Sequence, residues 1–180
     1  MDTLDSTRDL KSSLALLGKK APHLSFELVC LEVEPKERNP SQYTQPNLEV
    51  VQGPILCLYG IDPQFIADKV LPLMDKRPDL TLFLLEEELP HLLHFLMSKT
   101  GYACLTHPRI FFDTLSRGEL AFDDLALKTL KGPTCWLTPF PKESDLWTQS
   151  EAQKAIFHSV YAQLQGHLSL YKEFGRLIIG

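Results

Sequence analysis

The sequence predicts an α/β fold with a parallel sheet of about four strands covered by helices. The first observation is the continuous apolar run over residues 54–60, which is typical of a strand buried on both faces. The second is that similar runs recur at residues 80–85, 109–112 and 134–137. The third is that segments of helical periodicity lie between them, and alternating strands and helices indicate βαβ units.

The connections between these strands predict their order in the sheet. Asp62-Pro63 begins the first helix as an N-cap followed by a proline at the first helical position, and this helix runs to about Lys76, with a kink or frayed end near Pro72. The next helices are expected at residues 89–99, ending before Gly101, and at residues 115–130. Right-handed crossovers then predict a Rossmann-like half-sheet in the order 3-2-1-4.

The segments that flank this unit predict two smaller parts. We expect a helix at residues 4–18, ended by Gly18, and a β-hairpin made of a strand at residues 26–33 and a short strand at residues 48–51. A long helix is expected at residues 150–176. The predicted division is a helix and hairpin extension (1–52), a Rossmann-like domain (53–141) and a C-terminal helix (142–180). Because that helix ends on apolar residues, we expect it to lead to a further domain or to pack on a partner.

Composition excludes several classes of protein. The 180 residues are 44% hydrophobic and 23% charged, as in an ordinary globular domain. The net charge of −5 and the absence of a Lys/Arg-rich window argue against a nucleic-acid partner. The densest basic group is expected to be a solvated helix face; it comprises Arg8, Lys11, Lys19 and Lys20. The 13 prolines outnumber the 9 glycines, which argues mildly against a glycine-rich phosphate loop.

Location and redox state are predicted from the same counts. No apolar run approaches the about 20 residues of a membrane span, and the N-terminus lacks the pattern of a signal peptide, so we expect a cytoplasmic protein that does not contact a membrane. The four cysteines lack CxxC spacing and are expected to be buried thiols; they are Cys30, Cys57, Cys104 and Cys135.

Candidate site residues follow the strands of the predicted sheet. Ligands of open parallel sheets bind beyond the carboxyl ends of the strands. That rule selects Gly60 and Asp62 after the first strand, Glu86 after the second and Asp113 after the third. Glu86 has the position of the acid that holds a ribose hydroxyl in nucleotide-binding sheets, and Asp113 could lie beside an adenine ring. These four residues are therefore the predicted cofactor-binding residues.

The same residues also have a purely structural interpretation. Asp62 would cap a helix, where its carboxylate competes with a phosphate, and the acids at residues 86–88 would be a solvated strand end. His91 and His94 could share a metal but lack a third ligand at suitable spacing, so no metal site is predicted. No hydrolase, P-loop or zincin motif is present, and no catalytic residue is predicted.

Two tryptophans flank the exit of the fourth strand. Trp136 and Trp147 are expected to pack in the core or at an interface, and a stacking platform for a sugar or a base is the alternative.

Residues 54–113 resemble the N-terminal Rossmann-like region of the motility-associated factor (Maf) glycosyltransferases and the related 6-hydroxymethylpterin diphosphokinase MptE-like proteins. The similarity comprises the first strand (55–60), the segment 76–80, the second strand with Glu86 and the segment 107–112. Residues 10–24 resemble the opening helix of that family, and residues 171–175 resemble the segment leading to its catalytic domain.

The resemblance implies a non-catalytic N-terminal module that serves assembly or interaction with a substrate or a protein. Family members carry a GxGxG-type turn where this chain has Gly60-Ile61-Asp62-Pro63, and the catalytic domain of the family has no counterpart among these residues. The implied partner is another protein or a C-terminal catalytic domain, with a homo-oligomer as a further option, and no cofactor is expected. The alternative is an enzyme resembling S-adenosylmethionine-dependent methyltransferases, or another nucleotide- or nucleotide-sugar-binding enzyme, that uses the acids at the strand ends.

Overall fold

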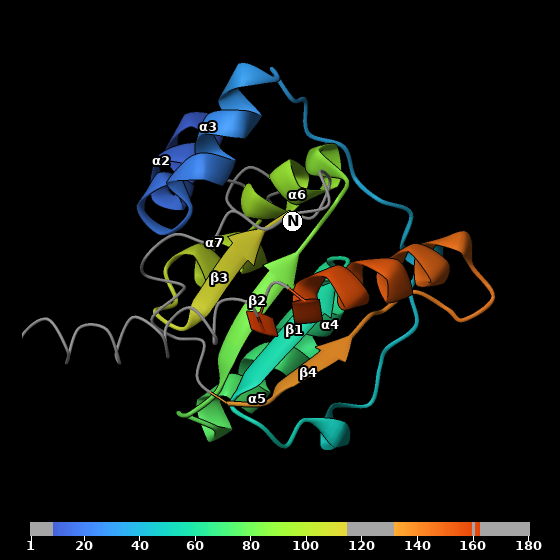
Figure 1. The fold of residues 1–180 in the computed structure, drawn as a ribbon. Helices are drawn as coiled ribbons and strands as arrows, with labels where there is room; N and C mark the ends of the chain where they lie inside the picture. Colours follow the sequence, from blue (N-terminus) through green and yellow to red (C-terminus); the bar gives the residue numbers. More distant parts are fainter. Residues whose placement is uncertain (1–8, 115–131, 160, 163–180) are drawn as a thin grey trace, which may run out of the picture.

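The chain folds around one parallel sheet (Figure 1). The structure is a computed structural model that describes residues 9–114, 132–159 and 161–162. The sheet has the order β3-β2-β1-β4; its strands are β1 (Ile55–Tyr59), β2 (Thr81–Leu85), β3 (Ile110–Asp113) and β4 (Thr134–Leu137). All three strand pairs are parallel, and Cys57 lies opposite Phe83 on β2 and Trp136 on β4. The predicted α/β class and the order 3-2-1-4 are therefore confirmed.

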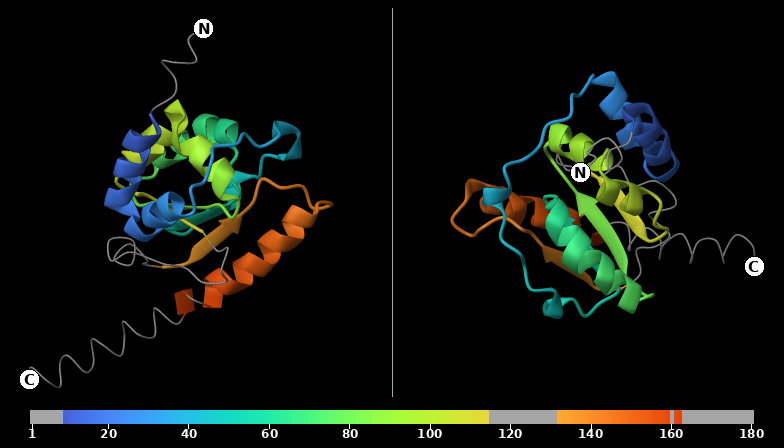
Figure 2. Two further views of the ribbon diagram at one scale, coloured as in Figure 1. Left: turned by 90° about the horizontal axis from the view of Figure 1, so that it is seen from above. Right: turned by 180° about the vertical axis from the view of Figure 1, so that it is seen from behind.

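Helices cover both faces of the sheet (Figure 2). One face carries α2 (Leu10–Lys20), α3 (Pro22–Cys30), α4 (Pro63–Phe65), α5 (Leu71–Lys76), α6 (Leu89–Leu96) and α7 (Lys99–Leu105). The other face carries a helix over residues 145–159, drawn in orange and red. Alternate residues of β1 divide between the two cores: Leu56 and Leu58 pack toward the first set, and Cys57 and Tyr59 pack with Trp136 toward the second.

The N-terminal extension is helical, and the predicted β-hairpin is wrong. Residues 26–33 were expected to form a strand, but α3 covers Pro22–Cys30, with Pro22 at its first turn. Leu24 and Leu28 are both buried. They are four residues apart, which is the spacing of side chains on one face of a helix and not of a strand. The expected return strand is instead a short 3₁₀ turn, η2 (Leu48–Val50), capped by Asn47. Gly18 lies within α2 and does not end it.

The helix after β1 contains a wide turn. It begins as predicted, with Asp62 as N-cap and Pro63 at its first turn. A π-helical segment, η3 (Ile66–Val70), then joins α4 to α5, and the N–H of Leu71 bonds the carbonyl of Ile66. Pro72 cannot donate a hydrogen bond to the preceding turn, and a π turn is a known way to absorb such a break. The expected kink therefore takes the form of a π turn before the proline, and the helix continues to Lys76.

The helix predicted at residues 89–99 is two helices. α6 ends at Leu96, and Ser98 caps α7 by accepting a hydrogen bond from the N–H of Gly101 at 3.0 Å. Gly101 lies inside α7 rather than ending a helix, and a β-carbon there would lie 1.9 Å from the carbonyl oxygen of Phe95. The glycine thus allows α7 to turn closely against the end of α6.

Several expectations concern single side chains or the ends of the chain. Lys20 is not solvated: it donates to the backbone carbonyls of His107 and Ile110, and burial lowers its pKa to about 8. Cys57 and Cys104 are buried as expected, whereas Cys30 is exposed; all four thiols are free. The C-terminal helix begins at residue 145 rather than 150. The helix predicted at residues 115–130 and the continuation of the last helix beyond residue 162 lie outside the described residues.

One finding concerns membranes. None of the helices in the described ranges combines the length and the hydropathy that crossing a bilayer requires.

Candidate functional site

The predicted site residues meet at the carboxyl edge of the sheet. Backbone hydrogen bonds join the ends of neighbouring strands there: the N–H of Gly60 donates to Leu85 at 2.8 Å, and the N–H of Glu86 donates to Asp113 at 3.2 Å. Asp62 follows within two residues of Gly60 and is 8% exposed. The structure therefore brings Gly60, Asp62, Glu86 and Asp113 to one edge, as parallel strands require.

Glu86 is paired with an arginine that is distant in sequence. Arg38 binds it through two parallel hydrogen bonds, Nη1 to Oε1 at 2.6 Å and Nη2 to Oε2 at 2.8 Å. The side chains are 5% and 2% exposed. Burial alone would lower the pKa of Arg38, but the hydrogen bonds and the charge of Glu86 outweigh it and raise that pKa. The arginine is therefore held as a cation inside the protein.

The remaining oxygen positions of Glu86 bind the backbone. Oε1 also accepts the N–H of Ile61 at 3.1 Å, and Oε2 accepts the N–H of Glu88 at 3.0 Å. A carboxylate offers about four lone-pair positions, and all four are used here. The interpretation of residues 86–88 as a solvated strand end is wrong for Glu86, because this residue is the centre of a buried network.

Arg38 belongs to an extended segment that crosses this edge, which we call the strap (residues 33–47). The strap is bonded along its length: the N–H of Lys36 donates to Pro90 at 3.0 Å, the hydroxyl of Tyr43 donates to the carbonyl of Ile61, and the N–H of Thr44 donates to Pro139. Burial raises the pKa of Tyr43 to about 12, so its hydroxyl stays a donor at neutral pH. The strap thus joins the helices α2 and α3 to the sheet by specific contacts.

The Gly60 turn is filled by an aromatic ring from the loop after β4. Gly60 has a φ of +91°, and a β-carbon there would lie 2.6 Å from two ring carbons of Phe140. This turn lies at the end of β1, which has β2 and β3 on one side and β4 on the other. Ligands of such folds bind at this point of the sheet, where the strand order changes direction. Phe140 also stacks with Tyr43 and lies 5.1 Å below the guanidinium of Arg38. The space beside this turn is therefore occupied by a side chain of the protein itself.

Asp62 is a helix cap, as the structural interpretation proposed. Its Oδ1 accepts the N–H of Gln64 at 3.1 Å and that of Phe65 at 3.4 Å. Burial raises the pKa of this carboxyl above its ordinary value. Asp113 is also buried, and its Oδ1 accepts the N–H of Thr114 at 2.8 Å. Both acids therefore have structural partners at the positions where a ligand was predicted.

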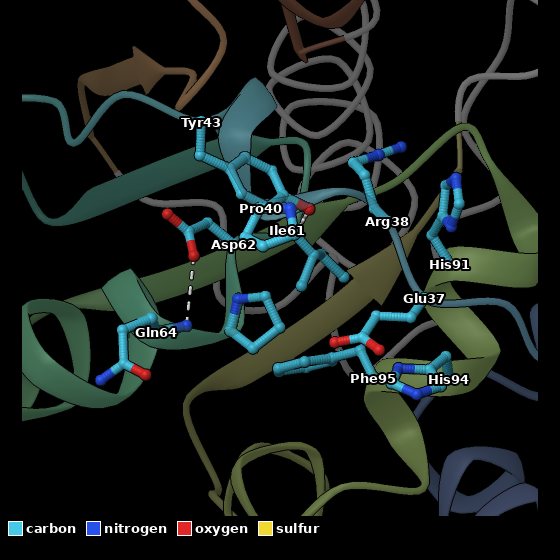
Figure 3. A pocket seen from close by; sticks show the side chains of 11 residues that line it. Glu37, Arg38, Pro40, Tyr43, Ile61, Asp62, Gln64, His91, His94 and Phe95 are labelled. Atoms are coloured by element: carbon cyan, nitrogen blue, oxygen red, sulfur yellow. Dashed lines mark hydrogen bonds between the residues drawn. The ribbon is translucent and has the colours of Figure 1, made fainter.

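A pocket of about 200 Å³ remains beside the strap. It lies between the strap, the turn before α4 and the outer side of α6 (Figure 3). Its lining comprises Glu37, Arg38, Pro40, Tyr43, Ile61, Asp62, Pro63, Gln64, His91, His94 and Phe95. Among the predicted site residues, Asp62 borders this pocket.

A second pocket of about 260 Å³ adjoins the exit of β4. Trp147 lines it, with the ammonium of Lys142 5.9 Å from its ring. Trp136 also lines it, but this residue is only 8% exposed, stacks on Tyr59 and donates its indole N–H to Ser150 at 3.1 Å. Core packing is thus confirmed for Trp136.

The two histidines of α6 do not form a metal centre with their neighbours. The Nδ1 of His91 bonds the carbonyl oxygen of Lys36 at 2.8 Å, and His94 is exposed. Across the part of the chain that the structure describes, no three His, Cys, Asp or Glu side chains are arranged to hold a metal ion.

Sequence reasoning missed Arg38, Tyr43 and Phe140, which all lie outside the predicted strands and helices. Arg38 is surrounded by acids and prolines in a segment that reads as a loop, and no local pattern pairs it with Glu86, 48 residues away. The one available signal was the isolated Phe140 between Pro139 and Pro141, since a large apolar residue in a proline-rich loop needs a place to be buried.

Comparison with known proteins gives no relative for this chain: scans of family models, curated proteins and solved structures found no match. What the fold itself defines is a class, a Rossmann-like α/β protein, and in this chain the carboxyl edge of the sheet is filled by buried side chains of the protein itself.

Proposed function

We propose that this chain is a non-catalytic Rossmann-like module that serves assembly or contact with another protein, as the N-terminal module does in the Maf-like family that it resembles. The observation that carries the proposal is the bidentate pair between Arg38 and Glu86. An acid that binds a ribose must offer free oxygen lone pairs, and those of Glu86 are already used by Arg38, Ile61 and Glu88.

The Gly60 turn supports the same proposal. A pyrophosphate approaches such a turn because glycines leave the backbone N–H groups open. Here the ring of Phe140 lies against Gly60, and the N–H of Gly60 is bonded to Leu85. Nucleotide binding would require Phe140 to leave and Arg38 to release Glu86.

An exposed apolar surface favours a role in protein contact. Phe26, Val29 and Leu31 of the α3 region are 71%, 56% and 54% exposed. Phe26 and Val29 are three residues apart and therefore lie on the same side of α3, with Leu31 at its C-cap. Single exposed apolar side chains are common, whereas exposed apolar side chains close to one another are typical of sites that bind proteins. The partner in this proposal is another protein, a catalytic domain or a second copy of the chain.

Calorimetric titration tests the proposal. The ligands are S-adenosylmethionine, common nucleotides and nucleotide sugars, each added to the wild-type chain and to Glu86→Ala. We expect no heat of binding in either protein. Micromolar binding of any one ligand would overturn the proposal. Its loss in Glu86→Ala, with circular dichroism showing that the variant is folded, would support the alternative of an enzyme that uses the acids at the strand ends.

A further inference from the structure

The two outer strands of the sheet, β3 and β4, differ in how their outward backbone groups are used. The backbone of Ile110 in β3 points away from β2, and the ammonium of Lys20 donates to its carbonyl at 2.7 Å. Just after β3, the N–H of Thr114 donates to Oδ1 of Asp113 at 2.8 Å. A lysine at an edge strand is a common device that prevents another strand from pairing there. Side chains of the protein therefore occupy outward groups at both ends of the β3 edge.

The β4 edge lacks such side chains. Backbone groups of successive strand residues point to opposite sides, and the register with β1 turns those of Cys135 inward and those of Thr134 and Trp136 outward. No group of the described residues bonds these outward N–H and carbonyl groups. The strand also carries no charged side chain. An uncharged strand with open hydrogen-bonding groups is the kind of edge to which an extended segment adds.

The pocket of about 260 Å³ lies at this open edge. Trp136, Leu137 and Thr138 line it from the end of β4. The rest of its lining includes Pro46 of the strap and Trp147 of the helix over residues 145–159. Strand addition typically combines main-chain hydrogen bonds, which give affinity, with a side-chain pocket, which gives specificity. Both features occur together at the β4 edge.

The charge and the size of this pocket restrict its occupant. Its charged lining residues are Lys142 and Glu151, which have opposite signs, so the pocket favours no net charge. Its volume of about 260 Å³ lies below the about 300–1,000 Å³ typical of pockets for drug-sized ligands. The pocket therefore suits one large apolar side chain of an uncharged segment.

A second copy of β4 does not supply that side chain. If two β4 strands paired antiparallel with Thr134 opposite Trp136, the residues of the second copy beside the pocket would be Gly132 and Pro133. Neither carries a large side chain, so a pair of copies would leave the pocket unfilled. This favours a segment of another protein.

We propose that the β4 edge binds an extended, uncharged segment of another protein as an added strand, with one apolar or aromatic side chain of that segment in the pocket beside Trp147. The inference rests on the contact function proposed above and deepens it, because it names the form of the partner and the surface that binds it.

The test is an NMR titration of the ¹⁵N-labelled chain with the peptide acetyl-Ser-Val-Ser-Phe-Ser-Val-Ser-amide. We expect saturable shifts of the Trp136 and Thr138 amides with a dissociation constant of about 1 mM. Hydrogen exchange of the Thr134 and Trp136 amides should slow on binding, because the peptide carbonyls accept these N–H groups. A peptide with serine in place of phenylalanine should bind at least about fivefold more weakly, since it lacks the anchor.

N-methylated peptides test strand addition itself. Alternate amides of an added strand face β4 and the solvent. Methylating the set that faces β4 should abolish binding, and methylating the other set should leave the affinity within about twofold.

Variants of the chain locate the site. Trp147→Ala removes a wall of the pocket and should weaken binding about tenfold. Thr134→Pro removes an outward donor at an edge position that tolerates proline, and should weaken binding about fivefold. Phe26→Ala is the matched control, an exposed aromatic residue of α3, and should change nothing. Circular dichroism checks that each variant is folded, and the N-methylated peptides give a result that needs no variant.

Three results would overturn the inference: no saturation at about 10 mM peptide, equal binding of the two N-methylated peptides, or unchanged affinity in Trp147→Ala. Weaker binding in Phe26→Ala alone would assign the peptide to the α3 surface instead. A dimer in sedimentation that protects the Thr134 and Trp136 amides without peptide would make a second copy the occupant, and would also overturn it. None of these outcomes depends on nucleotide binding, so the β4 edge and the proposed function fail separately.

Discussion

The two halves of the carboxyl edge differ in what fills them. In the inner half, at the ends of β1 and β2, Phe140 lies against Gly60 and Arg38 neutralises Glu86. In the outer half, between the strap and α6, a pocket stays open beside Asp62. Both halves belong to the carboxyl edge of the same parallel sheet. The difference between them therefore comes from side chains of the strap and of the loop after β4. Residues outside the sheet thus decide whether a Rossmann-like edge is a cofactor site or an internal contact.

The strongest test of the closed half is Glu86→Ala. The variant leaves Arg38 buried without its partner, and we expect it to lower the free energy of unfolding by about 3–5 kcal/mol. Urea unfolding monitored by circular dichroism measures this. Glu88→Ala is the matched control, because Glu88 is exposed and its side chain makes no capping bond, so its cost should stay within about 0.5 kcal/mol. The apolar pair Arg38→Met with Glu86→Leu should recover only part of the loss, because it removes the buried charge but leaves the N–H groups of Ile61 and Glu88 without their acceptor. If Glu86→Ala unfolds like the wild type, the inner half is not closed by this pair.

The next largest effect is expected at the Gly60 turn. Gly60→Ala forces a non-glycine residue to a φ of +91° and places its β-carbon 2.6 Å from Phe140. The expected cost is about 2–4 kcal/mol. In a Phe140→Ala background the clash disappears, and the cost of Gly60→Ala should fall by about 1–2 kcal/mol. Gly18→Ala is the control, since a β-carbon there makes only ordinary contacts. An equal cost in both backgrounds would contradict the contact between Phe140 and the turn.

A smaller effect is expected where the open half begins. Asp62→Ala removes the side-chain acceptor for the N–H groups of Gln64 and Phe65, and should cost about 1 kcal/mol. Asp62→Asn keeps an acceptor and should stay within a few tenths of a kcal/mol. Thermal unfolding of the two variants separates the loss of the cap from the loss of the charge. A large cost for Asp62→Asn would mean that the negative charge of Asp62 stabilises the fold, and that neighbouring groups of the chain already compensate this charge.

The smallest effect is a dependence on pH. Burial raises the pKa of Asp62 in the folded chain above its ordinary value of 3.8. Between these two pKa values the folded chain binds more protons than the unfolded chain, so this residue contributes stability as the pH falls through the raised pKa. The free energy of unfolding of the wild type should therefore rise relative to that of Asp62→Asn as the pH is lowered through that window. The opposite slope would mean that the capping hydrogen bonds from Phe65 and Gln64 outweigh burial and lower this pKa.

The sheet could be predicted from the sequence because its signals are local. The apolar runs that became β1, β2 and β4, and the Asp62-Pro63 start of α4, each depend on neighbouring residues only. The position of the four candidate residues at one edge followed from the parallel topology.

The contacts that close the edge could not be predicted, because they join segments far apart in the chain. Arg38 pairs with Glu86 across 48 residues, and nothing near Arg38 indicates that partner. The N-terminal error has a different cause. Residues 26–33 are rich in apolar and β-branched side chains, which favours a strand, but burial of Leu24 and Leu28 on one helical stripe outweighed that preference. Tertiary packing therefore decided the conformation.

The π turn over Ile66–Val70 also affects the direction, around the helix axis, in which the residues before it face. One residue advances an α-helix by about 100° around its axis. A π turn holds about one residue more than an α turn, so deleting one residue here would let the turn close as regular α-helix and would leave the direction of Asp62 and Phe65 nearly unchanged. A second deletion would rotate the segment that carries these residues relative to α5, and either the cap would turn away from the pocket or Phe65 would leave the core. The wide turn therefore gives this helix a tolerance of one residue in chain length before the carboxylate is redirected.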